Sequence, residues 1–94
     1  MLYIRQIRVQ APGTTNQHII DVKYSGTKTG PLMTASRATI VSVIDGGGDV
    51  YTYNNATGAG ARVVTHDGAN YLKYITTEVD GKETNNLLEL PRFQ

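Results

Sequence analysis

The sequence predicts an α+β fold in which one short helix packs on a mainly antiparallel sheet of about five strands. Short segments rich in Val, Ile, Thr and Tyr, which suit strands, fill most of the chain. Gly- and Asn-rich turns separate them, and a single segment carries the capping residues of a helix. The expected order is strand, strand, helix, strand, strand, strand. The length of 94 residues predicts a single domain over residues 1–94.

The first two strands are expected to form an antiparallel hairpin with a long loop. In residues 2–9 the apolar positions change phase near Arg5–Gln6, which predicts a β-bulge there. Residues 18–24 alternate regularly between polar and apolar positions. The side chains expected to share one face of this strand are His18, Ile20, Val22 and Tyr24.

Residues 34–45 fit both a strand and a helix. Their many β-branched residues favour a strand. Ser36, however, is a good N-cap, and Gly46 stands where a glycine commonly ends a helix. On a helix the apolar residues Ile40, Val43 and Ile44 would share one face. Because of the capping residues, we predict a helix over residues 36–45.

The second half of the chain is expected to add three strands and a C-terminal segment. The strands are predicted at residues 50–54, 61–66 and 70–77. Asp67–Gly68 is a two-residue hairpin signal, and Asp80–Gly81 marks a further turn. Residues 86–91 are too short for a full helix, so we expect one helical turn or an extended segment whose leucines cover the core.

A set of residues along the whole chain carries a family resemblance. Near the start and in the middle these residues are Ile4, Ile7, His18, Ile19, Val22, Ser36, Ile40, Ile44 and Gly46. The most specific part is the end, with Tyr74, Ile75, Thr77, Asp80, Gly81, Asn86, Leu87, Leu88, Leu90 and Pro91. In these residues the chain resembles a small family of standalone domains of unknown function, found mainly in Gram-positive bacteria. The chain departs from the family pattern at Asn85, where an Asp is usual. The resemblance implies the helix and a structural role for the C-terminal motif, and it implies no activity.

Composition excludes several classes of protein. The chain has no Cys, which excludes disulfides and thiolate chemistry. Arg5 and Arg8 interrupt the apolar start, so we expect no signal peptide, and no segment reaches the roughly 20 apolar residues that span a bilayer. We therefore expect a soluble cytoplasmic protein without membrane contact.

The net charge of +1 conceals two opposed halves. Residues 1–37 hold five basic side chains and one acidic side chain, whereas residues 38–94 hold four basic and seven acidic ones. A basic half could meet an anionic partner. We expect instead that folding mixes the two halves so that their charges neutralise each other.

The two histidines are the main candidates for chemistry. His18 and His66 show no metal-ligand spacing, and we expect each to end a strand and bond to neighbouring backbone groups. An enzyme that uses His18 or His66 with Asp80 is one hypothesis, and a turn in which Asp80 accepts backbone N–H groups is the alternative. No nucleophile or cofactor motif occurs, so the chain is expected to need no cofactor and not to be an enzyme.

The six tyrosines offer a second function. Tyr51 and Tyr53 share one face of a predicted strand. The basic residues considered with them are Arg5, Arg8, Lys23, Arg62 and Lys73. Aromatic platforms with nearby cations can stack single-stranded nucleic acid, although the signature of an RNA-recognition domain is absent. Packing within the sheet is the simpler explanation of the tyrosines.

These observations lead to one main hypothesis. The chain is expected to be a small non-enzymatic interaction module that binds a protein partner, or itself as a homodimer through a sheet edge. Weak binding of single-stranded nucleic acid and an enzyme based on a histidine remain as alternatives.

Overall fold

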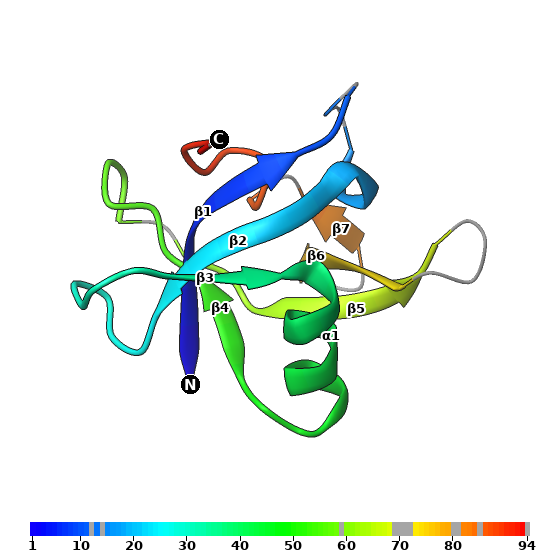
Figure 1. The fold of residues 1–94 in the computed structure, drawn as a ribbon, viewed down its shortest axis with the longest axis horizontal. Helices are drawn as coiled ribbons and strands as arrows, with labels where there is room; N and C mark the ends of the chain where they lie inside the picture. Colours follow the sequence, from blue (N-terminus) through cyan, green and yellow to red (C-terminus); the bar gives the residue numbers. More distant parts are fainter. Residues whose placement is uncertain are drawn as a thin grey trace.

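The computed structural model describes residues 1–11, 13, 15–58, 60–68, 73–79, 82–84 and 86–93. These residues form an α+β fold with one α-helix and two sheets of mostly antiparallel strands (Figure 1). The strands are β1 (Leu2–Val9), β2 (Ile19–Ser25), β3 (Met33–Ser36), β4 (Val50–Thr52), β5 (Val63–Asp67), β6 (Lys73–Val79) and β7 (Lys82–Thr84). The helix is α1 (Arg37–Asp45), and a short 3-10 helix, η1 (Asn16–His18), precedes β2. None of the helices in the described part of the chain has the length and hydropathy needed to cross a membrane.

The prediction of a single sheet of about five strands is wrong. One sheet, here sheet A, has the order β3-β2-β1-β4, and sheet B has the order β5-β6-β7. An antiparallel bridge between Tyr51 and Arg62 links the two. The sequence pattern identifies strands without showing which of them pair, and β4 pairs with β1 in parallel. The prediction also missed β3 and β7, which have only four and three residues.

The predicted bulge in the first strand is confirmed. The register of β1 against β2 shifts between Ile4 and Gln6, so Arg5 is the extra residue. The bulge turns the chain so that Ile4 and Ile7 both lie fully buried in the core, although they are an odd number of positions apart. Without the bulge, one of the two side chains would face solvent.

The regular alternation predicted for the second strand is wrong. Ile19 and Val22 are both fully buried, whereas Ile20 is only half-buried. The register against β1 shifts again, because Arg8 pairs with Asp21 and Val9 pairs with Ile19. Ile20 is thus the extra residue of a second irregularity, which exchanges the faces of the strand at this point.

The predicted helix is confirmed. The Ser36 Oγ accepts a hydrogen bond of 3.2 Å from the Thr39 backbone N–H, as an N-cap does. Ile40 is buried, and Val43 and Ile44 pack against the core. The helix ends at Asp45 with Gly46 as its C-cap, as predicted, and the following Gly47 is in the left-handed region with φ of 95°.

The hairpin at the centre of sheet B differs from the prediction. β5 and β6 pair in antiparallel fashion, but the last pair is Asp67 with Lys73, so five residues separate the strands. A two-residue turn at Asp67–Gly68 is therefore wrong. Residues 70–72 of the predicted strand lie outside the described residues, as do Asp80–Gly81 and Asn85.

The C-terminal segment closes the core beside β1 (Figure 1). Residues 86–89 form a turn, and Leu87 and Leu90 are buried while Leu88 packs against the core. Ile7 in β1 donates its N–H to the Pro91 carbonyl at 3.0 Å, and its carbonyl accepts from Phe93 at 3.0 Å. The segment therefore pairs with β1 and leaves the start of β1 to pair with β4.

Candidate ligand-binding hollows

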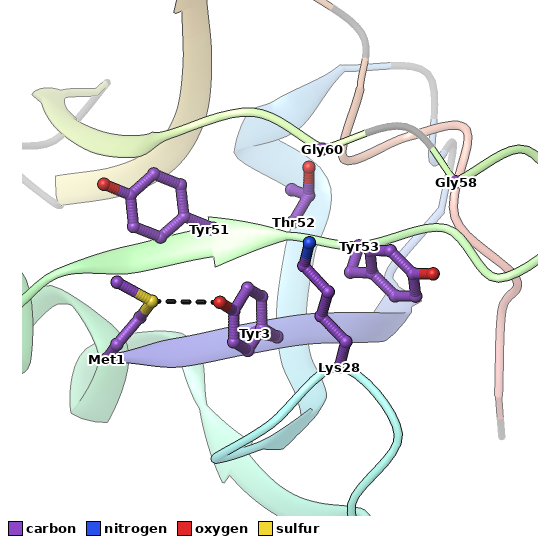
Figure 2. Close-up of a pocket in the computed structure, with 8 residues that line it drawn as sticks. All are labelled: Met1, Tyr3, Lys28, Tyr51, Thr52, Tyr53, Gly58 and Gly60. Carbon is purple, nitrogen blue, oxygen red and sulfur yellow. Dashed lines mark hydrogen bonds between the residues drawn. The ribbon is translucent and has the colours of Figure 1, made fainter.

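A hollow of about 350 Å³ lies where β1 and β4 meet (Figure 2). We call it the tyrosine hollow. Its lining residues are Met1, Tyr3, Lys28, Tyr51, Thr52, Tyr53, Gly58 and Gly60. The parallel pairing of β1 and β4 sets Tyr3 opposite Tyr51, and their ring centroids lie 6.3 Å apart. The hollow thus presents a pair of aromatic rings that comes from two distant parts of the sequence.

Lys28 brings a positive charge to the tyrosine hollow. Its Nζ lies 5.5 Å from the centroid of the Tyr53 ring, as in a cation–π contact. Figure 2 shows the ammonium group between Tyr53 and Thr52, at the same opening as the Tyr3 ring. Lys28 is exposed and forms no ion pair among the described residues.

Two glycines allow the loop after β4 to border the hollow. Gly58 has φ of 71°, a conformation that residues with a Cβ rarely adopt. A Cβ on Gly60 would meet the Thr52 carbonyl oxygen at 2.8 Å, so only glycine permits this approach to β4. The loop is also held by a hydrogen bond of 2.7 Å from the Gly58 N–H to the Asn54 carbonyl.

A second hollow of about 180 Å³ is lined in part by the same loop. We call it the arginine hollow. Its lining residues are Arg5, Gln6, Leu32, Asn54, Asn55, Ala56 and Pro91. Arg5, the bulged residue of β1, donates from Nη1 to the Gly30 carbonyl at 3.0 Å. No described residue that lines either hollow is acidic.

Most of the basic residues singled out from the sequence contact a partner within the fold. Arg8 pairs with Asp21, Arg62 pairs with Asp49 at 3.1 Å, and Lys73 pairs with Asp45 at 2.7 Å. Lys23 lies over the Phe93 ring, 4.8 Å from its centroid. Of the predicted set, only Arg5, Tyr51 and Tyr53 line a hollow.

The pair between Lys73 and Asp45 changes the pKa of both groups. Hydrogen bonds from Lys73 and then from Thr65 lower the pKa of the Asp45 carboxyl group. The hydrogen bond to Asp45 in turn raises the pKa of Lys73. Both side chains are exposed, so this pair contributes little to stability.

The ion pairs do not neutralise one half of the chain with the other. Each ion pair among the described residues joins two residues of the same half. Arg8 pairs with the only acid of residues 1–37, and the other cations of that half contact carbonyls or rings. The expected mixing of the halves is therefore not found in these pairs.

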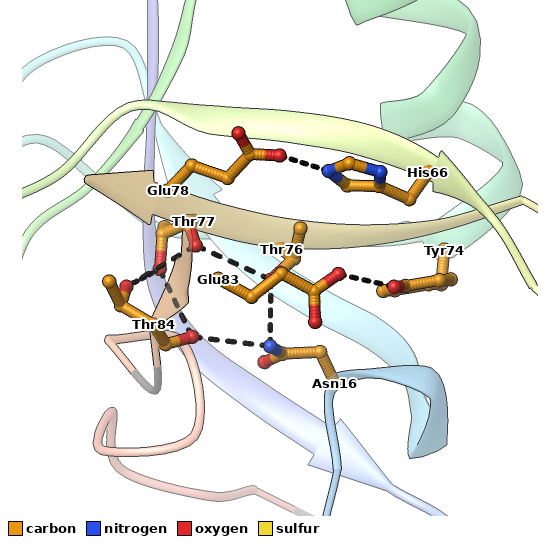
Figure 3. A network of polar contacts seen from close by, with 8 residues as sticks. All are labelled: Asn16, His66, Tyr74, Thr76, Thr77, Glu78, Glu83 and Thr84. Carbon is orange, nitrogen blue, oxygen red and sulfur yellow. Dashed lines mark hydrogen bonds and ion pairs between the residues drawn. The ribbon is translucent and has the colours of Figure 1, made fainter. Parts of the chain in front are cut away.

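A polar network connects sheet B with η1 (Figure 3). The buried Asn16 donates from Nδ2 to the Thr76 Oγ1 at 2.7 Å and to the Thr84 carbonyl at 3.2 Å. Tyr74, which is 9% exposed, donates its hydroxyl to Glu83. This hydrogen bond, followed by burial, raises the pKa of Tyr74 to about 12. We refer to these contacts as the sheet B network.

The two histidines have local partners. His18 ends η1, and its Nδ1 accepts from the Thr15 N–H at 3.2 Å, so it bonds to neighbouring backbone as expected. His66 makes a hydrogen bond with the Glu78 side chain, not with the neighbouring backbone as expected, and it stacks on Tyr74 with ring centroids 6.0 Å apart. Neither histidine lines the hollows, and Asp80, their proposed partner, lies outside the described residues. Among the described residues no three His, Asp or Glu side chains are grouped as metal ligands would be.

A protein-family model matches most of the chain. A family described as protein of unknown function (DUF3892) matches residues 3–91. The chain belongs to this family. The match runs from Tyr3 in the tyrosine hollow to Pro91 beside β1, and it confirms a family of unknown function. No curated protein and no solved structure matches the chain.

The residues that resemble the C-terminal family motif have structural positions in this DUF3892 chain. Tyr74, Thr77, Leu87 and Leu90 are buried. Asn86 donates from Nδ2 to the Thr84 Oγ1 at 3.0 Å. None of these five residues lines either hollow, whereas Pro91 of the same motif lines the arginine hollow.

Sequence reasoning missed Tyr3 and Lys28. Tyr3 reaches the hollow through a parallel pairing with β4 that the sequence pattern does not encode. Lys28 lies in a loop between β2 and β3, where no periodicity assigns a direction to a side chain. The only available signal was the excess of basic residues in the first 37 residues.

Proposed function

We propose that this protein is a non-enzymatic interaction module that binds a protein segment by adding a strand to β3. The segment comes from a partner or from a second copy of the chain. One observation carries the proposal: β3 is an edge strand whose apolar start is exposed. Leu32 and Met33 are 38% and 51% exposed, and β3 pairs with β2 on one side.

Edge strands usually have features that discourage pairing. Charged residues, proline and bulges commonly protect them. β3 reads Met-Thr-Ala-Ser and carries no charge within the strand. Its free backbone N–H and C=O groups can therefore bond to an extended segment, as in recognition by β-augmentation.

The oligomeric state and partner retention test this proposal. Light scattering measures self-association, and a pulldown from native lysate measures capture of partners. We expect Met33→Lys to abolish both, because a charge on the edge opposes pairing. Ala38→Lys is the matched control. Ala38 is exposed on α1, so this substitution adds the same charge away from the edge.

Two outcomes contradict the proposal. One is a strictly monomeric protein that retains no partner. The other is self-association or capture that Met33→Lys leaves at the level of the Ala38→Lys control.

The alternatives have unequal support. The histidine-based enzyme gains none from the geometry, since His18 and His66 lie outside both hollows. Binding of single-stranded nucleic acid is a second candidate, because the tyrosine hollow combines aromatic rings with a lysine. The cytoplasmic location expected from the sequence remains part of the main proposal.

A further inference from the structure

We propose that the tyrosine hollow and the arginine hollow together bind a short stretch of single-stranded nucleic acid. In this proposal the bases stack on the hollow's tyrosines, and the phosphates lie near Lys28 and Arg5. The proposal deepens the second candidate function named above and rests on it. No residue of β3 itself lines either hollow, although Leu32, which precedes β3, borders the arginine hollow.

The first argument is charge. Lys28 and Arg5 line the two hollows, and neither forms an ion pair among the described residues. No acidic side chain among those residues lines either hollow. The lining therefore suits an anionic ligand. Nucleic acid is such a ligand, because its backbone phosphates are anionic and its bases are aromatic.

The second argument is the aromatic lining. Tyr3, Tyr51 and Tyr53 all border one hollow of about 350 Å³, which lies within the size range of small-ligand pockets. The rings of Tyr3 and Tyr51 are inclined by 34°, so each offers its own face and they do not stack in parallel. Bases stack on such rings without regard to sequence, and the cation near Tyr53 strengthens this kind of site.

The third argument is continuity between the hollows. Tyr53 lines the tyrosine hollow, and the next residues of the same loop, Asn54 and Asn55, line the arginine hollow. In the proposed site, a strand of nucleic acid that extends past Tyr53 reaches the neighbouring hollow, where the Asn54 and Asn55 amide groups and Arg5 are available to it. Amide side chains can bond to base edges, which single strands leave accessible.

The proposed site includes only some of the basic residues of the protein. Arg8, Arg62 and Lys73 are engaged by Asp21, Asp49 and Asp45, so their charges are already compensated. The proposal thus predicts that Lys28 contributes to binding and that Arg8 contributes little.

Fluorescence anisotropy tests the proposal with a labelled oligouridine of about eight nucleotides. We expect binding at about 25 mM salt that weakens at about 200 mM salt. A plot of log association constant against log salt concentration should have a slope near −0.7 for each phosphate contacted, so contacts from two cations predict a slope of about −1.4. The chain has no Trp, so quenching of tyrosine fluorescence gives a second readout of stacking.

Matched variants identify the site. Lys28→Gln is expected to reduce the magnitude of the salt slope by about 0.7, while Lys82→Gln, on the exposed surface of β7, leaves it unchanged. Tyr51→Leu is expected to weaken binding by roughly fivefold or more. Arg8→Gln is expected to bind as the wild type does. Because Lys28 is exposed, its variant keeps the test valid even if Tyr51→Leu fails to fold.

Several results would overturn this inference. Absence of binding at the lowest salt is one, since phosphate contacts are strongest there. Equal affinity for a duplex of the same sequence is another, because paired bases cannot stack on the tyrosines. A peptide of about eight glutamates that binds as tightly as the oligonucleotide would show a general anion site. A proline-rich peptide that binds more tightly would show a protein-recognition groove. The strand edge is tested separately through Met33, which lines neither hollow.

Discussion

The sheet B network and the tyrosine hollow contain similar side chains in different surroundings. In the network, Tyr74 bonds to Glu83 and Asn16 bonds to Thr76 and Thr84. In the hollow, Tyr51 and Tyr53 border open space beside Lys28. The same residue types thus have their partners inside the fold in one region and face a hollow in the other.

This difference separates structural from binding roles. Buried polar groups must be hydrogen-bonded, and removing one partner leaves the other unsatisfied at a cost in stability. Groups that border a hollow keep their hydrogen-bonding and stacking capacity for a ligand. We therefore expect mutations in the network to change stability, and equivalent mutations in the hollow to change binding.

The largest expected effect is on the free energy of unfolding, in a comparison of two tyrosine substitutions. Tyr74→Ala should reduce the free energy of unfolding by about 3–5 kcal/mol, since it removes a buried aromatic ring and the partner of Glu83. Tyr51→Ala should reduce it by less than half as much, because Tyr51 is only half-buried. Urea denaturation followed by circular dichroism measures both, and equal losses would contradict the comparison.

A smaller effect compares two asparagines. Asn16→Ala should reduce the free energy of unfolding by about 1–3 kcal/mol, because the buried Thr76 hydroxyl and the Thr84 carbonyl lose a donor. Asn55→Ala, in the exposed loop of the arginine hollow, should change it by less than about 0.5 kcal/mol. The same denaturation curves provide the measurement. A neutral Asn16→Ala would show that the network does not contribute to stability.

A third effect depends on pH and reaches its full size only near pH 12. Because the folded state raises the pKa of Tyr74 from 10.0 to about 12, the fold retains a proton that the unfolded chain releases between these values. The contribution of Tyr74 to the free energy of unfolding should therefore be fully present below about pH 10. It should be lost as the pH rises towards 12, which lowers the free energy of unfolding by at most about 2–3 kcal/mol.

Melting temperatures from pH 8.5 to 11.5 test this expectation. Tyr74→Phe should remove most of the decline, while Tyr51→Phe should leave it in place. A decline that persists unchanged in Tyr74→Phe would show that another group causes it.

Much of the local structure could be predicted from the sequence. The bulge at Arg5, the helix capped by Ser36 and the burial of Leu87 and Leu90 follow from periodicity, capping chemistry and apolar content. The second irregularity, at Ile20, could not be predicted, because the segment alternates regularly in sequence and the shift arises only from its pairing with β1.

The candidate site was only partly accessible to such reasoning. The sequence indicates Tyr51, Tyr53 and Arg5, but it also indicates Arg8, Arg62 and Lys73, each of which has an acidic partner in the fold. Charge content is visible in a sequence, whereas the distance between a cation and its carboxylate is not.

The sequence by itself determined the α+β class, the helix and the segments that form most of the strands, because these depend on neighbours within a few residues. Only the tertiary structure decided that there are two sheets, that β4 pairs in parallel with β1, and that Tyr3 and Lys28 meet Tyr51 and Tyr53. These arrangements join residues that are far apart in the chain, and they are selected by how the whole set of apolar faces is buried at once.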